Sequence, residues 1–327
     1  MQSRAGAGRG RLTAGGEADL LEGTGVISLD RDHRRGLLIA LAGFMLLSCG
    51  DAVIKSMAGA WPPTAVAALR YSIGAVGLGV VVFRREGLGG FRTRLPALQL
   101  LRGVGMALAT LGFFCAIFIM PLADAVSISF VGPMLIVLLA ALFLGEPVRR
   151  QSGIAIAFAF LGVLIVLRPN LLALGPAALL PLLAASANAV YMIGNRLTIG
   201  DASILAQQFF VALVCAPIMI AAAWLGHLSG HPGFALSLPP WHVIARCALV
   251  ATTASTAHWM IYRATMLAGA GAIAPMVYSQ ILVATVIGWA VFGNAPPAAT
   301  LVGIAVIVAS GLYLWRSGRA PAPEPVD

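Results

Sequence analysis

Four ionisable side chains interrupt long apolar stretches of this sequence, and they are the first indication of chemistry. They are Asp51, Lys55, Arg70 and His258. A charge placed in hydrocarbon costs roughly 3 kcal/mol, so each group should face a cavity or a partner rather than lipid. We therefore expect these residues to bind a ligand or to couple its movement to an ion.

Asp51 and Lys55 are four residues apart, which places them on one face of a helix. As an ionisable carboxylate, Asp51 can bind a proton or a cation, with its occupancy linked to that of a substrate. The alternative is a local ion pair between the two, with the ammonium group of Lys55 reaching the membrane surface. The sequence leaves both interpretations open.

Arg70 lies in the next apolar run. Its planar, permanently charged guanidinium group suits a carboxylate or a phosphate, although a structural pairing with Asp51 is an equal alternative. Neutral polar residues recur later in the chain and would orient a ligand without adding charge. These are Asn188, Tyr191, Gln207 and Gln208.

A third group of candidates lies nearer the C-terminus. His258 titrates near neutral pH, but a single histidine on an apolar helix is also a common packed hydrogen-bond donor. Tyr262 can stack on a ring-bearing substrate or belong to an aromatic belt at the membrane surface. Tyr278 and Gln280 complete the set, and we expect the amide of Gln280 near mid-membrane, where it can bind the polar edge of a ligand.

Composition indicates what must position these residues. The chain has 327 residues, of which 60% are hydrophobic and only 10% charged, against about one quarter charged in soluble domains. Crossing a hydrocarbon core about 30 Å thick takes about 20 apolar residues of helix. The sequence therefore predicts an all-α integral membrane protein with ten transmembrane helices, at residues 36–57, 64–83, 96–119, 121–144, 151–168, 174–194, 202–225, 242–262, 270–292 and 297–315.

The second half of the sequence repeats the first. Residues 268–315 align with 121–169 at an offset of about 148, which sets Gly293 against Gly145 and Tyr278 against Phe130. Detecting such a repeat constrains the architecture before any fold is named.

A second offset, of about 137, relates the earlier helices of the two halves: it pairs Asp51 with Asn188, and Arg70 with Gln207. Five helices per repeat turn the second copy over in the membrane, which is the inverted plan of secondary transporters.

The repeat also divides the chain. We expect a disordered cytoplasmic tail at 1–35, because this segment is too poor in apolar residues to order itself. Two five-helix repeats follow at 36–169 and 170–316, and a short cytoplasmic tail at 317–327.

Arginines set the expected orientation, since positive residues collect on the cytoplasmic side. With the N-terminus inside, arginines occur in every inner connector, as at Arg84, Arg85, Arg149 and Arg150. The protein should therefore be multi-pass in the cell (inner) membrane, surrounded by the lipid bilayer, with both termini cytoplasmic, as a monomer or a homodimer.

Several classes of function are disfavoured. The net charge of +9 comes with no basic helix interleaved with aromatics, so nucleic acid is not an expected partner. The cysteines lack metal-ligand spacing and indicate no metal. Lys55, the only lysine, does not follow a glycine, which excludes a Walker A motif. Because no catalytic residue set and no cofactor are implied, we do not expect an enzyme.

Short motifs in the first half resemble a known family. Pro-Leu-Ala-Asp-Ala at 121–125, Leu-Gly-Glu at 144–146 and Leu-Gly-Val-Leu-Ile-Val-Leu-Arg-Pro at 161–169 resemble the EamA family of the drug/metabolite transporter superfamily. Ser-Cys-Gly-Asp-Ala-Val-Ile-Lys at 48–55 and Ala-Ala-Leu-Arg-Tyr at 67–71 are similar to that family's opening helices.

The resemblance covers about residues 36–316 and implies ten helices, two inverted repeats and movement of small metabolites. Two positions depart from the family pattern. Asn294 stands where the second repeat usually carries glutamate, and Asp51 stands where the first helix often has asparagine. The resemblance names no substrate.

The sequence thus predicts a secondary active transporter of a small polar or amphipathic metabolite, amino-acid-like or nucleoside-like. It would work by alternating access, with the proton as the candidate coupling ion. A multidrug or guanidinium-like cation exporter is an alternative, which Asp51 favours and Arg70 opposes. A structural or sensory membrane protein without solute flux is an alternative of another class.

Overall fold

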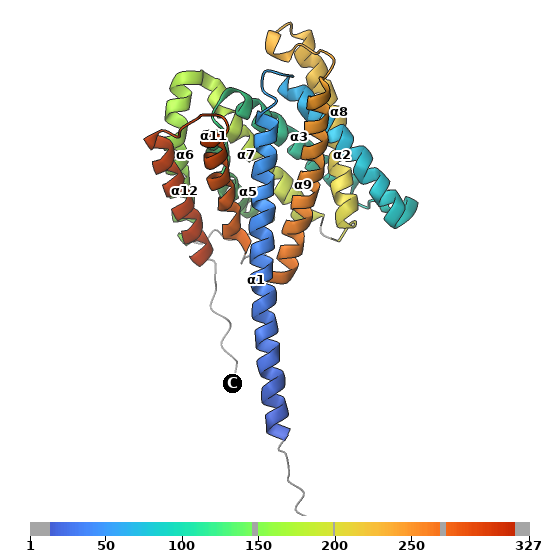
Figure 1. Cartoon of the computed structure of the whole chain (residues 1–327), viewed down its shortest axis with the longest axis vertical. Coiled ribbons are helices and arrows are strands. Elements are labelled where there is room, and N and C mark those ends of the chain that lie inside the picture. The colour runs from blue at the N-terminus through green and yellow to red at the C-terminus, as the bar shows by residue number, and fades with distance from the viewer. Residues whose placement is uncertain (1–13, 146–149, 199, 269–272, 318–327) are drawn as a thin grey trace, which may run out of the picture.

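The computed structural model describes residues 14–145, 150–198, 200–268 and 273–317, and for residues 14–31 it describes the backbone alone. Over these residues the chain is helical and contains no β-strand (Figure 1). The all-α class predicted from the sequence is confirmed. Glu146, Pro147, Arg149 and nearly all of the predicted C-terminal tail lie outside the described residues.

The first half of the chain begins with a long helix, α1 (Ala14–Lys55). The helix begins at Ala14, inside the segment at 1–35 that we expected to be a tail, and no proline interrupts the sequence from there to Lys55. The elements that follow are α2 (Pro63–Glu86), the 3₁₀ helix η1 (Gly87–Phe91), α3 (Pro96–Ile119), α4 (Leu122–Ser129), α5 (Gly132–Leu144) and α6 (Arg150–Leu174).

The second half has the same succession of long helices. It comprises η2 (Gly175–Leu179), α7 (Leu180–Leu197), α8 (Ile204–Leu228), η3 (Pro232–Phe234), α9 (Trp241–Ala268), η4 (Ala274–Tyr278), α11 (Ser279–Ala290) and α12 (Ala298–Ser317). We expected the fifth span to end at residue 168, but Pro169 lies inside α6, which continues to Leu174.

Six helical stretches of the described chain are long and apolar enough to cross a membrane. One of them, Gly153–Leu197, contains both α6 and α7, and two shorter apolar helices lie at Pro275–Ala290 and Ala298–Tyr313. α9, predicted as a span at 242–262, is not among the six, since threonines, serines and His258 make it more polar. The protein is therefore an all-helical multi-pass membrane protein.

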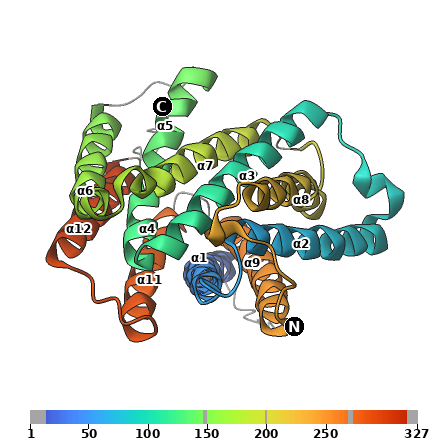
Figure 2. The ribbon, with the colours of Figure 1, turned by 90° about the horizontal axis from the view of Figure 1, so that it is seen from above.

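Four helix pairs form most of the bundle. α1 packs along α9, α2 along α8, α3 along α7 and α6 along α12 (Figure 2). Each pair joins one helix from the first half of the chain to one from the second. The two halves are thus interleaved rather than separate.

Two helices of the bundle are interrupted at corresponding places. The fourth predicted span breaks between α4 and α5 at Phe130 and Val131, and the ninth changes from 3₁₀ to α-helix at Tyr278. Pro133 and Pro275 lie beside these interruptions, where proline disfavours an unbroken helix. A glycine with a positive φ angle follows each of the next helices: Gly145 directly after α5, at 68°, and Gly293 three residues after α11, at 67°.

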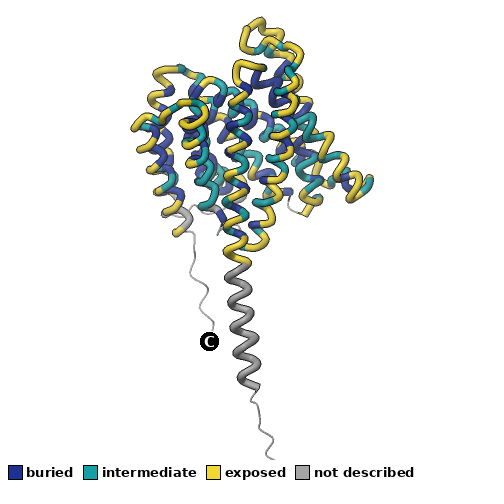
Figure 3. The backbone as a smooth tube through the Cα atoms, in the orientation of Figure 1, coloured by how far each residue is buried: buried dark blue, intermediate teal, exposed yellow. Residues whose placement is uncertain are grey.

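Buried residues line the inner faces of the helices, and the outward faces expose leucine, valine and phenylalanine side chains (Figure 3). Asp124 is an exception in this apolar interior, because its side chain is acidic and only 4% exposed. Its carboxylate accepts hydrogen bonds from Asn170 Nδ2 of α6 at 2.9 Å and from Thr300 Oγ1 of α12 at 2.7 Å. Asp124 therefore connects three helices.

Candidate functional site

The predicted polar residues of the central helices line adjoining cavities. We call one the Asp51 cavity, with an empty volume of about 850 Å³, and a second the His258 cavity, of about 570 Å³. A third, smaller space of about 270 Å³ also has Asp51 and Arg70 in its wall. Arg70 lines all three spaces and is therefore the residue that they share.

Arg70 extends from α2 between aromatic rings. Its guanidinium carbon lies 4.7 Å from the ring centre of Tyr71 and 5.6 Å from that of Phe114. Cation–π contact favours a flat orientation of the guanidinium group against the aromatic face. Within the described residues the one ion pair joins Arg35 to Asp32, so no described carboxylate neutralises Arg70 at salt-bridge distance.

The Asp51 cavity combines one acidic residue with neutral polar groups and aromatic walls. Asn188 of α7 and Gln280 of α11 lie in its lining, together with Ser129 at the end of α4. Asp51 comes from α1, so four elements that are distant in sequence meet there. The apolar part of the wall includes Phe113 and Phe114 of α3.

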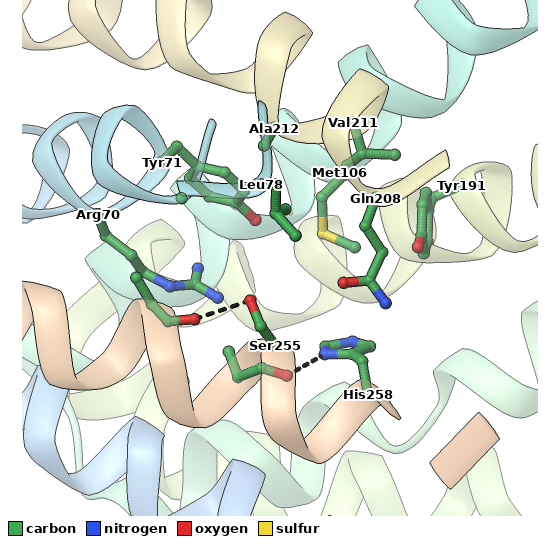
Figure 4. Close-up of a pocket in the computed structure, with 13 residues that line it drawn as sticks. Arg70, Tyr71, Leu78, Met106, Tyr191, Gln208, Val211, Ala212, Ser255 and His258 are labelled. Carbon is green, nitrogen blue, oxygen red and sulfur yellow. Dashed lines mark hydrogen bonds between the residues drawn. The ribbon is translucent and has the colours of Figure 1, made fainter. Parts of the chain in front are cut away.

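The His258 cavity lies between α2, α3, α7, α8 and α9 (Figure 4). His258 Nδ1 lies 2.7 Å from the carbonyl oxygen of Ala254, so Nδ1 carries a proton and donates to it. In the neutral ring, Nε2 is then free to accept a hydrogen bond. Tyr191, Gln208 and Ser255 add polar groups to a wall that is otherwise apolar.

The structure thus brings together seven of the candidates from the sequence around these cavities: Asp51, Arg70, Asn188, Tyr191, Gln208, His258 and Gln280.

The other four candidates lie elsewhere. Lys55 does not pair with Asp51, because its Nζ donates to the carbonyl oxygens of Ile117 and Met120 at 3.0 and 2.7 Å. Gln207 Nε2 donates to the carbonyl oxygens of Thr198 and Ala202, at 3.0 and 3.2 Å, and so supports the turn before α8. Of the two neighbouring glutamines that we expected to orient a ligand, Gln208 is the one that lines the His258 cavity.

Two tyrosines also differ from the expected ligand-facing arrangement. Tyr262 is 38% exposed and lies outside the walls of these cavities. Tyr278 is buried, with its ring centre 5.4 Å from that of Phe130. Its contribution in this structure is to packing.

Other lining residues were missed from the sequence. Tyr71 follows Arg70 directly and its hydroxyl lies 2.8 Å from Thr110 Oγ1. Met106, Phe113 and Phe114 also line the Asp51 cavity, but in an apolar run nothing distinguishes residues that face a cavity from those that face lipid. The one available signal was polarity, which marks Thr110.

One end of the bundle, which we call the Arg102 end, is closed by buried polar contacts. Arg102 of α3 is 3% exposed, and its Nε donates to Asn195 Oδ1 of α7 at 2.6 Å. Its Nη1 donates to Gln99 Oε1, and Gln99 Nε2 donates to Asp201 Oδ2 at 3.0 Å. Helix α3 is thereby joined to α7 and to the connector that follows it.

At the opposite end, the Lys55 end, a matching contact is present. Arg246 of α9 donates from Nη1 to the carbonyl oxygen of Ser56 at 2.9 Å, which joins α9 to the end of α1. A cavity of about 1330 Å³ also lies at this end, between Trp61 and the connector at His231. Trp61 Nε1 donates to the carbonyl oxygen of Ser237 at 3.0 Å and so ties that connector to the bundle.

Part of the chain matches a known protein family. Residues 34–168 match the EamA-like transporter family. An S-adenosylmethionine uptake transporter of Rickettsia bellii is 25% identical over 70% of this chain and 75% of its own length. A riboflavin transporter of Rhizobium johnstonii is 29% identical over 72% of this chain and 75% of its own length. A pseudopaline exporter of Pseudomonas aeruginosa is 25% identical over 88% of this chain and 98% of its own length.

A solved crystal structure is also similar. It has 23% sequence identity and a TM-score of 0.59, and the match covers 88% of this chain and 100% of the other. At this identity the likeness concerns the fold alone.

Proposed function

Because residues 34–168 belong to the EamA-like transporter family, we propose that this chain is a secondary active transporter of a small polar or amphipathic metabolite. The substrate is amino-acid-like or nucleoside-like and crosses by alternating access. The observation that carries the proposal is the position of Arg70, a permanent cation in the wall shared by three adjoining central cavities. A charge placed there, inside a membrane bundle, calls for a ligand.

The proposed architecture is ten membrane helices in two inverted repeats, at residues 36–169 and 170–316. The helix pairs support it. If each helix is replaced by the one five spans away, the α1–α9 pair becomes the α7–α3 pair, as an internal repeat requires. The same replacement leaves the α2–α8 pair and the α6–α12 pair unchanged. The corresponding interruptions at Phe130 and Tyr278 support it as well.

Such a repeat allows the two halves to rock about a site near the midplane, as in other inverted-repeat transporters. We assign both termini to the cytoplasm, from the distribution of arginines. The protein acts in the inner membrane, as a monomer or a homodimer, without nucleic-acid partners, metal or cofactor. Its family and its transporter relatives favour transport over enzymatic catalysis.

The proton is our candidate coupling ion, and Asp51 is the residue that would bind it. Asp51 lines the same cavity as Arg70, so protonation of its carboxylate changes the charge that a substrate meets. Replacing Asp51 by Asn should uncouple flux from pH in proteoliposomes without unfolding the protein. Unchanged pH dependence at equal protein incorporation would remove Asp51 from this role.

A cation exporter, for multidrug or guanidinium-like compounds, is the second candidate, because Asp51 supplies the counter-charge for a cation. Arg70 repels such a substrate from the same cavity. Relatives that transport S-adenosylmethionine, riboflavin or pseudopaline agree better with a polar metabolite.

The experiment that tests the function is untargeted metabolite profiling of cells and medium. It compares the expressed protein with an empty vector, with Arg70→Ala, and with Arg263→Ala as a matched arginine outside these cavities. A compound that leaves or enters cells with the wild type and Arg263→Ala, but not with Arg70→Ala, supports transport and gives its direction. No change in any metabolite, with the protein present in the membrane, contradicts it and favours a structural or sensory role.

A further inference from the structure

Four arginines cluster in the sequence where α2 ends and the chain turns back toward α3. All four are exposed: Arg84, Arg85, Arg92 and Arg94. We call residues 76–95, which comprise the last part of α2, the helix η1 and the connector to α3, the basic arm. Figure 2 shows this end of α2 and η1 projecting to the side of the bundle, beyond α8.

No described part of the chain neutralises these arginines. The one ion pair of the described residues joins Arg35 to Asp32, and within the same residues none of the four guanidinium groups forms a hydrogen bond or an aromatic contact. The one acidic residue of the arm is Glu86, whose Oε1 accepts a hydrogen bond from Ser203 Oγ at 2.6 Å. The arm therefore presents positive charge without a counter-charge at contact distance.

The arm is packed onto the rest of the fold. Val82 is buried, and a Cβ on Gly90 would lie 2.6 Å from Val82 Cγ1, so η1 lies directly against α2. The ring of Phe91 meets that of Phe209 of α8 edge to face, with the ring centres 5.0 Å apart. These contacts hold the backbone that carries the arginines in one place.

An apolar stripe leads to the arginines along one face of α2. Val76, Val80 and Phe83 are exposed and follow one another at helical spacing. Arg84 continues the same face one turn beyond Val80. Leu88, which is 74% exposed, extends the apolar surface into η1. All of these residues belong to a helical stretch, Pro63–Phe91, that is long and apolar enough to cross a membrane, so the stripe faces lipid acyl chains.

We infer that the basic arm binds an anionic phospholipid from the leaflet at the Arg102 end of the bundle. The phosphate group contacts the arginines, and the acyl chains lie along the stripe of Val76, Val80 and Phe83. Guanidinium groups bind phosphate oxygens through paired N–H donors, and each cation near an anionic membrane surface adds to the attraction. This site lies on the outer surface, apart from the central cavities and whatever they transport.

Other anionic ligands match the arm less completely. A soluble acidic protein offers carboxylates to the arginines, but it cannot reach a stripe that lies within a membrane span. Free phosphate likewise leaves the stripe without a partner. A phospholipid supplies the anion and the acyl chains in one molecule, in the order in which the arm presents their partners.

Native mass spectrometry of the full chain in detergent micelles tests the preference for an anionic lipid. The two probes are phosphatidylglycerol and phosphatidylcholine with the same oleoyl chains, titrated separately. We expect wild type to bind the first molecule of phosphatidylglycerol at least about 5-fold more tightly than the first molecule of phosphatidylcholine, because two or more arginines act on the net charge. Equal affinities for the two lipids overturn the inference.

Paired substitutions locate the site. Arg84→Gln with Arg85→Gln, and Arg92→Gln with Arg94→Gln, should each lower the preference for phosphatidylglycerol about 3-fold or more. The matched control is Arg263→Gln with Arg316→Gln, which removes the same charge from exposed positions in α9 and α12 and should keep the preference. An equal loss in the control pair would reveal a general effect of charge and overturn the assignment to the arm.

Inorganic phosphate distinguishes a lipid from a soluble anion. At the same concentration as phosphatidylglycerol it should leave the bound lipid in place, because it makes no contact with the apolar stripe. Displacement of the lipid would assign the arginines to a soluble phosphate and overturn the lipid site. All of these measurements are independent of solute flux, so their failure leaves the proposed transport function standing.

Discussion

The rings of Phe130 and Tyr278 pack against each other, with their centres 5.4 Å apart, at the two points where membrane helices are interrupted. The two positions correspond in the aligned halves of the sequence. The contact therefore joins the two interruptions directly.

This contact predicts energetic coupling between the two residues. In a double-mutant cycle with Phe130→Leu and Tyr278→Leu, we expect a coupling free energy of about 1 kcal/mol, since a packed aromatic pair contributes roughly 0.5–1.5 kcal/mol beyond its buried area. Unfolding in detergent measures it. Tyr313→Leu, an exposed tyrosine of α12, should show no coupling to Phe130→Leu. Fully additive effects of Phe130 and Tyr278 would contradict the prediction.

Two glycines of α6 should respond oppositely to alanine. A Cβ at Gly162 would lie 2.8 Å from Ile307 Cγ1 and 3.0 Å from the carbonyl oxygen of Gly303, whereas a Cβ at Gly153 meets nothing within 4 Å. Gly162→Ala should therefore destabilise the protein by about 1–3 kcal/mol through overpacking against α12. Gly153→Ala should stabilise it by up to about 1 kcal/mol, because alanine favours helix.

Thermal unfolding of both variants in the same lipid nanodiscs checks this pair. The prediction is wrong if Gly162→Ala is as stable as Gly153→Ala. That result would mean that α6 and α12 separate easily enough to admit an extra methyl group.

Much of this fold follows from sequence because hydrophobic length and repetition are strong signals. The alignment of Gly145 with Gly293 anticipated two turns that follow helices, and both glycines adopt the left-handed backbone that favours this residue. The continuation of helix α6 past Pro169 was not anticipated. The free-energy cost of a proline inside a helix can be offset by tertiary packing, which the sequence does not display.

The site was harder to predict than the fold. Arg70 and Asp51 stood out because charge in an apolar run is conspicuous. Gln207 and Gln208 are chemically identical neighbours, and helix rotation alone decides that Gln208 faces the cavity while Gln207 supports a turn. Lys55 was expected near Asp51, but the carbonyl oxygens of Ile117 and Met120 lie within its reach, a tertiary relationship absent from local spacing.

Arg102 and Arg246 should differ in their contribution to stability although they occupy similar places near the starts of α3 and α9. Arg102 is buried and donates hydrogen bonds to two side chains, Asn195 and Gln99. Arg102→Met removes that donor from both, so we expect it to lower the free energy of unfolding by about 1–3 kcal/mol. Arg246 donates to one backbone oxygen at an exposed position, so Arg246→Met should cost under about 1 kcal/mol. Chemical unfolding in detergent measures both.

Cysteine labelling of the same two variants tests whether the contacts of Arg102 close their end of the bundle to water. Arg102→Met should increase the access of water-soluble thiol reagents to a cysteine introduced at Tyr191, which faces the guanidinium group of Arg102. Arg246→Met should not increase the access of these reagents to that cysteine. Equal labelling rates in both variants would argue against a closing role for Arg102.

Asp201 predicts a pH dependence of stability. The hydrogen bond from Thr93 Oγ1, together with those from Gln99 and the backbone of Arg94 and Leu95, lowers the pKa of Asp201 below its usual value of 3.8 and outweighs the opposing effect of partial burial. A group whose pKa is lower in the folded state stabilises the fold above the unfolded pKa and loses that effect as pH falls through the folded pKa.

We therefore expect wild type to lose stability in acid below about pH 4, and Asp201→Asn to lose less over the same interval. Unfolding temperatures measured from about pH 3 to pH 7 at constant ionic strength test this difference. Identical acid profiles for the two proteins would show that this network does not depend on the charge of Asp201.

Lys55 is the only lysine of the chain, and its amine is held by the two carbonyl oxygens at the end of α3 and lies 5.5 Å from the ring centre of Phe292. Apart from the N-terminus, amine-directed reagents thus have one target in the whole protein. The rate at which Lys55 becomes acylated reports how often α1, α3 and the α11–α12 connector separate at that end. The unmodified chain therefore carries its own site-specific sensor of opening.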